Sequence, residues 1–173
     1  AVCPKNINTF GDAIEKMRAI AVANGSGPLP EHVAFKENIL ERGRSIQTDK
    51  PSFIEEAENY TGSKVAFFTG CMVDYKFPEL GHKVVKILKE NGIDIDVPEG
   101  QVCCGSPLLR TGQTDIVQNL VDKNKEVFKD YDTVITICSG CGATLKNNHP
   151  QFGSNLNVMD ISEFLVDKID ESK

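Results

Sequence analysis

The sequence predicts an α/β fold with a parallel sheet and crossover helices over residues 64–173, preceded by a helical segment over residues 1–63. From residue 64 onward, short apolar runs typical of buried strands alternate with amphipathic helical patterns. Before residue 64 the pattern is helical and polar, interrupted by glycine and proline. A chain of 173 residues is long enough to bury a core without disulfide bonds.

The first region is expected to contain three helices. Apolar residues at helical spacing, ending at breakers in 24–28, predict a first helix around residues 13–21. A second is expected over 31–42, with Phe35, Ile39 and Leu40 facing inward. Residues 43–63 are expected to be a linker around a short acidic helix at 52–59. The region has too few apolar residues to fold convincingly alone, so we treat it as an appendage.

The second region is expected to hold four strands, of which 133–137 is the most strand-like because it is rich in β-branched residues. The helix over 79–91 carries Leu80, Val84, Ile87 and Leu88 at core-facing spacing. In chain order, the predicted elements are strand 65–68, helix 79–91, strand 93–97, helix 114–129, strand 133–137, strand 156–159 and helix 161–169.

Charge and hydropathy exclude several classes of function. The net charge is −6, the pI is about 5.1, and Lys and Arg are dispersed among acidic residues, so a nucleic-acid partner is not expected. No apolar run approaches the roughly 20 residues needed to cross a bilayer, so no transmembrane segment is expected. The first residues lack the pattern of a signal peptide, and we expect a cytoplasmic protein.

Five of the six cysteines lie in glycine-flanked clusters. The clusters are Gly70-Cys71, Cys103-Cys104-Gly105 and Cys138-Ser139-Gly140-Cys141-Gly142. Without a secretory signal, metal binding is favoured over disulfide bonds. Each cluster follows a predicted strand, and ligands of open parallel sheets gather at the carboxyl ends of the strands. We therefore expect the five thiols to meet at one edge of the sheet.

The chemistry of the residues alone leaves the bound group open. Zinc takes four tetrahedral ligands, which would leave Cys71 unexplained. A cubane iron–sulfur cluster also uses four cysteines, so the fifth indicates an unusual cluster, a substrate-facing thiol or an idle residue. Thioredoxin-like redox chemistry at the Cys138-x-x-Cys141 pair is a further alternative. Glycines beside the cysteines would let backbone N–H groups approach the sulfurs of a bulky cluster.

Two other residues are candidates for catalysis. Arg110 follows the Cys103-Cys104 pair in the sequence, and its guanidinium is suited to an anionic substrate such as a sulfonate or phosphate. His149 follows Cys141 and titrates in the range useful for proton donation near a thiolate. Both residue types are also common on protein surfaces without any such role.

At these residues the chain resembles the CCG, or cysteine-rich, domain family, whose pattern is a cysteine, a Cys-Cys-Gly triplet and a Cys-x-x-Cys pair. The family includes catalytic subunits of heterodisulfide reductase, a subunit of the thiol:fumarate reductase of methanogens and the iron–sulfur subunit of glycolate oxidase. The resemblance implies a non-cubane [4Fe-4S] cluster held by the five cysteines Cys71, Cys103, Cys104, Cys138 and Cys141. It also implies electron transfer with reduction of a small disulfide, the one formed by coenzymes M and B, or formation of this disulfide coupled to fumarate reduction.

The start of the chain carries a second resemblance. Ala1-Val2-Cys3-Pro4 is similar to the end of a ferredoxin motif, and residues 17–53 resemble the segment that follows such motifs in methanogen reductases. This implies that the chain is a fragment, that Cys3 takes no part in the five-cysteine site, and that partner subunits carry iron–sulfur clusters or flavin. The alternatives are a zinc-stabilised structural domain, an iron–sulfur subunit of a glycolate or lactate oxidase complex, and a metal-free thiol oxidoreductase.

Overall fold

A three-stranded parallel sheet lies at the centre of the protein, whose computed structural model describes residues 10–57, 62–166 and 168. The strands are β1 (Val65–Phe67), β2 (Thr133–Thr136) and β3 (Val158–Asp160), in the order β1-β2-β3. Phe67 pairs with Ile135, and Ile135 pairs with Met159, so the three strands end at a common edge. The predicted α/β class with a parallel sheet is confirmed.

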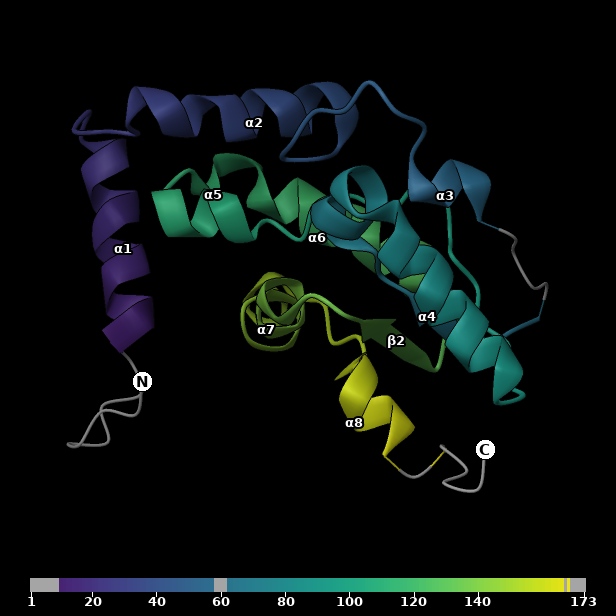
Figure 1. Ribbon diagram of the computed structural model, residues 1–173. Coiled ribbons are helices and arrows are strands. Elements are labelled where there is room, and N and C mark those ends of the chain that lie inside the picture. Colours follow the sequence, from purple (N-terminus) through teal and green to yellow (C-terminus); the bar gives the residue numbers. More distant parts are fainter. Residues whose placement is uncertain (1–9, 58–61, 167, 169–173) are drawn as a thin grey trace.

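Helices make up most of the remaining structure (Figure 1). Helices α1 and α2 both pack against α5, at one end of the molecule, whereas α3 packs against α4. The helical elements are α1 (Phe10–Ala23), α2 (Pro30–Arg42), α3 (Phe53–Glu56), the π-helical η1 (Met72–Lys76), α4 (Pro78–Glu90), α5 (Ser106–Thr111), the 3-10 turn η2 (Thr114–Ile116), α6 (Val117–Phe128), α7 (Ser139–Asn147), the 3-10 turn η3 (His149–Phe152) and α8 (Ile161–Leu165).

The predicted strand at 93–97 is wrong, because this segment makes only a single parallel bridge, between Asp96 and Ala66. Phe67 donates its N–H to Asp96 O (2.8 Å), and Asp96 donates to Val65 O (3.0 Å). The segment is short and ends at Pro98, which has no N–H to extend a ladder. It therefore occupies the place of an edge strand beside β1 without forming one.

Three residues predicted to face inward are partly or largely exposed. Leu40 is 64% exposed, and Leu80 and Ile87 are 39% and 43% exposed, whereas Ile39, Val84 and Leu88 are buried as expected. The buried stripe on α2 and on α4 is thus narrower than the apolar spacing suggested. The last predicted helix, at 161–169, is realised as α8 and ends at Leu165, and the acidic helix at 52–59 is realised as α3 and ends at Glu56. Residues 58, 59, 167 and 169 of these predictions lie outside the described residues.

Two large groups of buried side chains flank the sheet. On one side Phe67 packs with Leu88 of α4 and with Phe53 of α3, and on the other Phe68 packs with Phe128 of α6.

The proposed division of the chain at residue 63 stays a prediction. No helix among residues 10–57 and 62–166 has both the length and the apolar character that crossing a membrane requires.

Candidate cysteine site

Three separate segments bring the five predicted cysteines together. Cys71 lies just before η1 in the connection from β1, Cys103 and Cys104 precede α5, and Cys138 and Cys141 lie at the start of α7, just after β2. Neighbouring thiols are within hydrogen-bonding reach, in the order Cys71, Cys103, Cys104, Cys141 and Cys138. All are buried except Cys138, which is half-buried, and none forms a disulfide. We call this arrangement the thiol row.

Hydrogen bonds along the thiol row favour the thiolate at two positions. The Cys141 thiol and then the backbone N–H groups of Cys141 and Gly140 lower the pKa of Cys138 to about 5. Hydrogen bonds from the Cys103 and Cys141 thiols, and from the Ser106 backbone, hold the pKa of Cys104 well below its usual value despite burial. Both thiolates lie next to the first turn of a helix, where N–H groups are free to donate.

The other three cysteines are held as neutral thiols. Each donates to a neighbouring sulfur and is buried, so the pKa of Cys71 is raised, that of Cys103 is raised to about 12, and that of Cys141 is raised. Protonated and ionised sulfurs thus share protons within one row. Because metal ligands bind as thiolates, loading such a row with metal would release protons.

Gly70 provides the close approach that a cluster of sulfurs needs. Its φ is +62°, in the left-handed region that favours glycine, and a Cβ at this position would lie 2.9 Å from Cys141 Sγ. Two other glycines of the cysteine motifs are required for different structural reasons. Gly105 has a φ of +85° at the start of α5, and Gly142 brings α7 close to Thr136, whose Cγ2 would lie 3.3 Å from an added Cβ.

Buried polar side chains hold the backbone of the Cys103-Cys104 pair. Asn124 of α6 accepts from Val102 N–H (2.9 Å) and donates to Cys103 O (3.3 Å). Asn124 was not predicted as a site residue. The sequence could have indicated it, because Asn124 places a polar amide on the helix face that Leu120, Val121 and Phe128 otherwise make apolar.

His149 is fully buried and is therefore not the exposed surface histidine that the sequence left open as an alternative. Its Nε2 lies 2.9 Å from Cys104 O, and because a carbonyl only accepts, Nε2 carries the proton. Burial lowers the pKa of His149, which favours the neutral ring. Nδ1 is buried and finds no hydrogen-bond partner among the described residues. The ring therefore contacts the thiol row through the Cys104 carbonyl, and its predicted proton-donor role stays a prediction.

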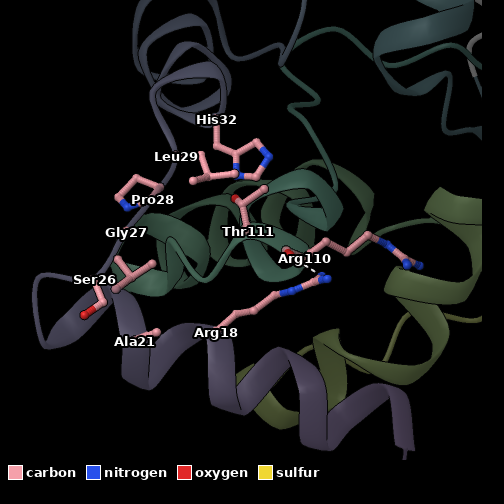
Figure 2. Close-up of a pocket in the computed structure, with 10 residues that line it drawn as sticks. Arg18, Ala21, Ser26, Gly27, Pro28, Leu29, His32, Arg110 and Thr111 are labelled. Atoms are coloured by element: carbon pink, nitrogen blue, oxygen red, sulfur yellow. Dashed lines mark hydrogen bonds between the residues drawn. The ribbon is translucent and has the colours of Figure 1, made fainter.

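Arg110 lies at a pocket of about 440 Å³ between α1, α2 and α5, which none of the five cysteines lines (Figure 2). Its side chain is exposed, and its Nε donates to Ser106 Oγ (3.1 Å). Arg18 of α1 reaches across to donate to Arg110 O (2.7 Å), as the dashed line in Figure 2 shows. The expected role of Arg110 in binding an anion stays a prediction.

Residues 43–45, expected to be part of a linker, instead lie against the thiol row. Ser45 N–H donates to Cys71 Sγ (3.3 Å), and Gly43 O accepts from Cys103 N–H (2.7 Å). Arg44 and Ser45 are both buried. No local pattern in the sequence indicated these contacts, because the partners are far apart along the chain.

The donor set fits a centre with several metal atoms better than a single ion. Among residues 10–57 and 62–166, no three His, Cys, Asp or Glu side chains converge as ligands of one metal ion. Five sulfurs in a row, with two favoured as thiolates and a glycine cradle beside them, suit a group whose positive charge is spread over several atoms. Cys3 lies outside the described residues, so the expectation that it is separate from the site stays a prediction.

Comparisons with known proteins find one matching family model and several similar proteins. Residues 65–146 match the cysteine-rich domain family, CCG. The chain is 54% identical over 172 residues to a subunit of the fumarate reductase (CoM/CoB) of Methanothermobacter marburgensis, covering 99% of this chain and 35% of that protein. It is 42% identical over 172 residues to an uncharacterized iron-sulfur protein of Methanococcus maripaludis, covering 95% of this chain and 34% of that one.

A more distant relative has a named activity of its own. A subunit of the dihydromethanophenazine:CoB--CoM heterodisulfide reductase of Methanosarcina acetivorans is 30% identical over 188 residues, covering 99% of this chain and 45% of that protein. The chain thus spans between 34% and 45% of the length of these three relatives. No solved structure matches it.

Proposed function

Because residues 65–146 of this chain belong to the cysteine-rich CCG domain family, we propose that the chain is an iron–sulfur electron-transfer module of a larger reductase subunit. In this proposal Cys71, Cys103, Cys104, Cys138 and Cys141 hold a [4Fe-4S] cluster of the non-cubane type. The substrate is a small disulfide or its thiols, as in the heterodisulfide and CoM/CoB fumarate reductases named among the relatives.

The thiol row is the observation that carries this proposal. Zinc would need four ligands that converge at about 2.3 Å from one point, and the described residues contain no convergent group. A multinuclear iron centre distributes its ligands over several metal atoms, so sulfurs in a row can all be used. Five thiolates also need more positive charge than one divalent ion supplies.

Each part of the site has a task in this function. A bound cluster would supply one-electron transfer to the substrate sulfurs. Gly70 leaves room beside Cys141, and Asn124 and His149 fix the two carbonyls of the Cys103-Cys104 pair. Cys138 is the half-exposed end of the thiol row, so substrate sulfur would approach from this end.

The complete reaction is proposed for the longer subunit and not for this chain by itself. The relatives of which this chain spans 35% and 45% are named as subunits of reductases, which supports partner subunits that carry further redox centres. Arg110, exposed on α5, remains our candidate for the anionic group of a substrate.

Anaerobic reconstitution with metal analysis tests the proposal. We expect about four iron and four sulfide per chain, a brown colour and a paramagnetic signal that differs from that of a cubane cluster. Cys104→Ser should lower iron content and alter the signal. Cys3→Ser serves as the matched control and should leave both unchanged. One zinc per chain without sulfide would refute the redox proposal in favour of a structural zinc domain.

A further inference from the structure

The end of α2 delivers a short segment to the thiol row from outside the CCG match. Residues 43–45 precede the matched residues 65–146. Ser45 N–H donates to Cys71 Sγ at 3.3 Å. Hydrogen bonds from the Ser45 hydroxyl and N–H both act to lower the pKa of this thiol. Gly43 O accepts from Cys103 N–H at 2.7 Å. Two of the five cysteines are thus contacted by a segment that the family motif does not include.

A buried ion pair fixes this segment in place. Arg44 is 6% exposed, and its Nε donates to Asp74 Oδ2 of η1 at 2.7 Å, while Nη1 donates to Gln101 O. Asp74 Oδ1 also accepts from Ile54 N–H at 3.1 Å. The ion pair therefore joins the segment to the η1 turn after Cys71 and to the residues just before Cys103.

The backbone of the segment is equally constrained. Gly43 ends α2 in the left-handed conformation, with φ at +72°, and its N–H donates to Ile39 O at 2.8 Å. A Cβ on Gly43 would lie 3.0 Å from Val102 Cγ1. Ser45 O accepts from Asn38 Nδ2 at 3.2 Å. With Gly43, Arg44 and the Ser45 carbonyl all held, the Ser45 donors have little freedom to turn away from Cys71.

Two donors aimed at one ligand sulfur have a definite electrostatic effect. A hydrogen bond to a metal-bound thiolate draws negative charge away from it, and the gain is larger when the centre carries an extra electron. Such donors stabilise the reduced state relative to the oxidised one. The two states of a centre held by Cys71 would therefore differ in their interaction with Ser45.

We propose that Ser45 is a positioning residue of the cluster site, which orients Cys71 and raises the reduction potential of the bound cluster. This inference rests on the proposed function, since it requires a redox centre at the thiol row. It adds to that function a contribution from the helical region before the CCG match. Arg44 and Asp74 act as the clamp that keeps Ser45 in place.

A redox titration of the reconstituted protein compares three variants with the parent chain. Ser45→Ala removes the hydroxyl donor and keeps the N–H donor. Ser45→Thr restores a hydroxyl at the same position. Ser154→Ala is the matched control, because Ser154 Oγ is also buried and finds no partner among the described residues. Iron and sulfide content and the unfolding midpoint are measured on each variant in parallel.

We expect Ser45→Ala to lower the equilibrium constant for one-electron reduction by up to about tenfold, a negative shift of up to about 59 mV. Iron content and the unfolding midpoint should stay close to those of the parent. If Ser45 had only a structural role, a shift in potential would come together with a loss of iron or of stability. Ser45→Thr should recover most of the shift, and Ser154→Ala should cause none.

The outcomes separate the two proposals. If the parent chain binds iron and sulfide but Ser45→Ala titrates as the parent does, the role of Ser45 is refuted and the proposed function stands. If the parent chain binds no iron and sulfide, the proposed function fails and the inference fails with it. If Ser154→Ala shifts the potential as much as Ser45→Ala, the effect is not specific to Cys71 and the inference is also refuted.

Discussion

Adding one methyl group to Gly70 should both destabilise the protein and weaken cluster binding at its cysteine site. Two costs combine in Gly70→Ala. The backbone at φ +62° lies in the left-handed region, which costs a non-glycine residue about 1–2 kcal/mol. The new Cβ would also lie 2.9 Å from Cys141 Sγ, and relief of such overpacking in a buried site costs about 1–3 kcal/mol more.

A matched variant isolates the second cost. Gly92 follows α4 with φ at +71°, and nothing lies within 4 Å of the position of its Cβ. Gly92→Ala should therefore lose only the backbone contribution of about 1–2 kcal/mol. The effect of a stiffer unfolded chain is the same for both variants and cancels between them.

Urea unfolding of the reduced, metal-free protein measures the difference in free energy. We expect Gly70→Ala to unfold about 1–3 kcal/mol more easily than Gly92→Ala. After reconstitution, Gly70→Ala should also hold less iron and sulfide, because the methyl group displaces Cys141, whereas Gly92→Ala should hold as much as the parent. Equal stability and equal iron content in the two variants would refute the view that Gly70 is a cradle for the thiol row.

Three further predictions concern the chemistry of single groups. In the metal-free protein, iodoacetamide should alkylate Cys138 before the other thiols at about pH 6–7, because the pKa of Cys138 is lowered to about 5 and its side chain is half-exposed. Mass spectrometry of peptides locates the adduct, and first reaction at another cysteine would contradict the prediction. Asp74→Ala should cost about 3–5 kcal/mol in urea unfolding by leaving Arg44 buried and unpaired, and adding Arg44→Met should recover part of it; no recovery would mean that the loss does not arise from the stranded charge. Burial and the hydrogen bond to Asp96 raise the pKa of Tyr131 to about 12, so the ultraviolet titration should lose a late phenolate step in Tyr131→Phe. Since the folded pKa is raised, this group's stabilisation is full below its unfolded pKa of about 10 and is lost as pH rises through about 12.

Local pattern was enough to predict the elements in which propensity and burial agree. The segment at 133–137 is rich in β-branched residues and forms β2, and the helical pattern of 114–129 appears as η2 followed by α6. The carboxyl ends of β1 and β2 bring Cys71 and Cys138 into one site, as their positions after strands predicted. In these cases each residue's preference and its neighbours favour the same structure.

Prediction failed where distant partners decide the structure. Helix α7 contains Gly140 and Gly142, which have low helix propensity, yet Gly142 allows the close packing of the helix against Thr136. Asn124 and Ser45 are ordinary polar residues in the sequence, and only the fold shows that they bond to cysteine segments far along the chain. Local pattern carries no information about such long-range hydrogen bonds.

The ring of Phe53 has a practical consequence for where this protein can be cut. Phe53 is fully buried, its ring centroid lies 6.0 Å from that of Phe67 in β1, and it fills the space left by the missing Cβ of Gly81, which would lie 2.7 Å from the ring. A recombinant domain limited to the matched residues 65–146 would lack Phe53 and leave a cavity beside the sheet. An expression clone that starts before Pro30 retains α2, the Arg44–Asp74 ion pair and Phe53, and is therefore the better starting point for a minimal domain.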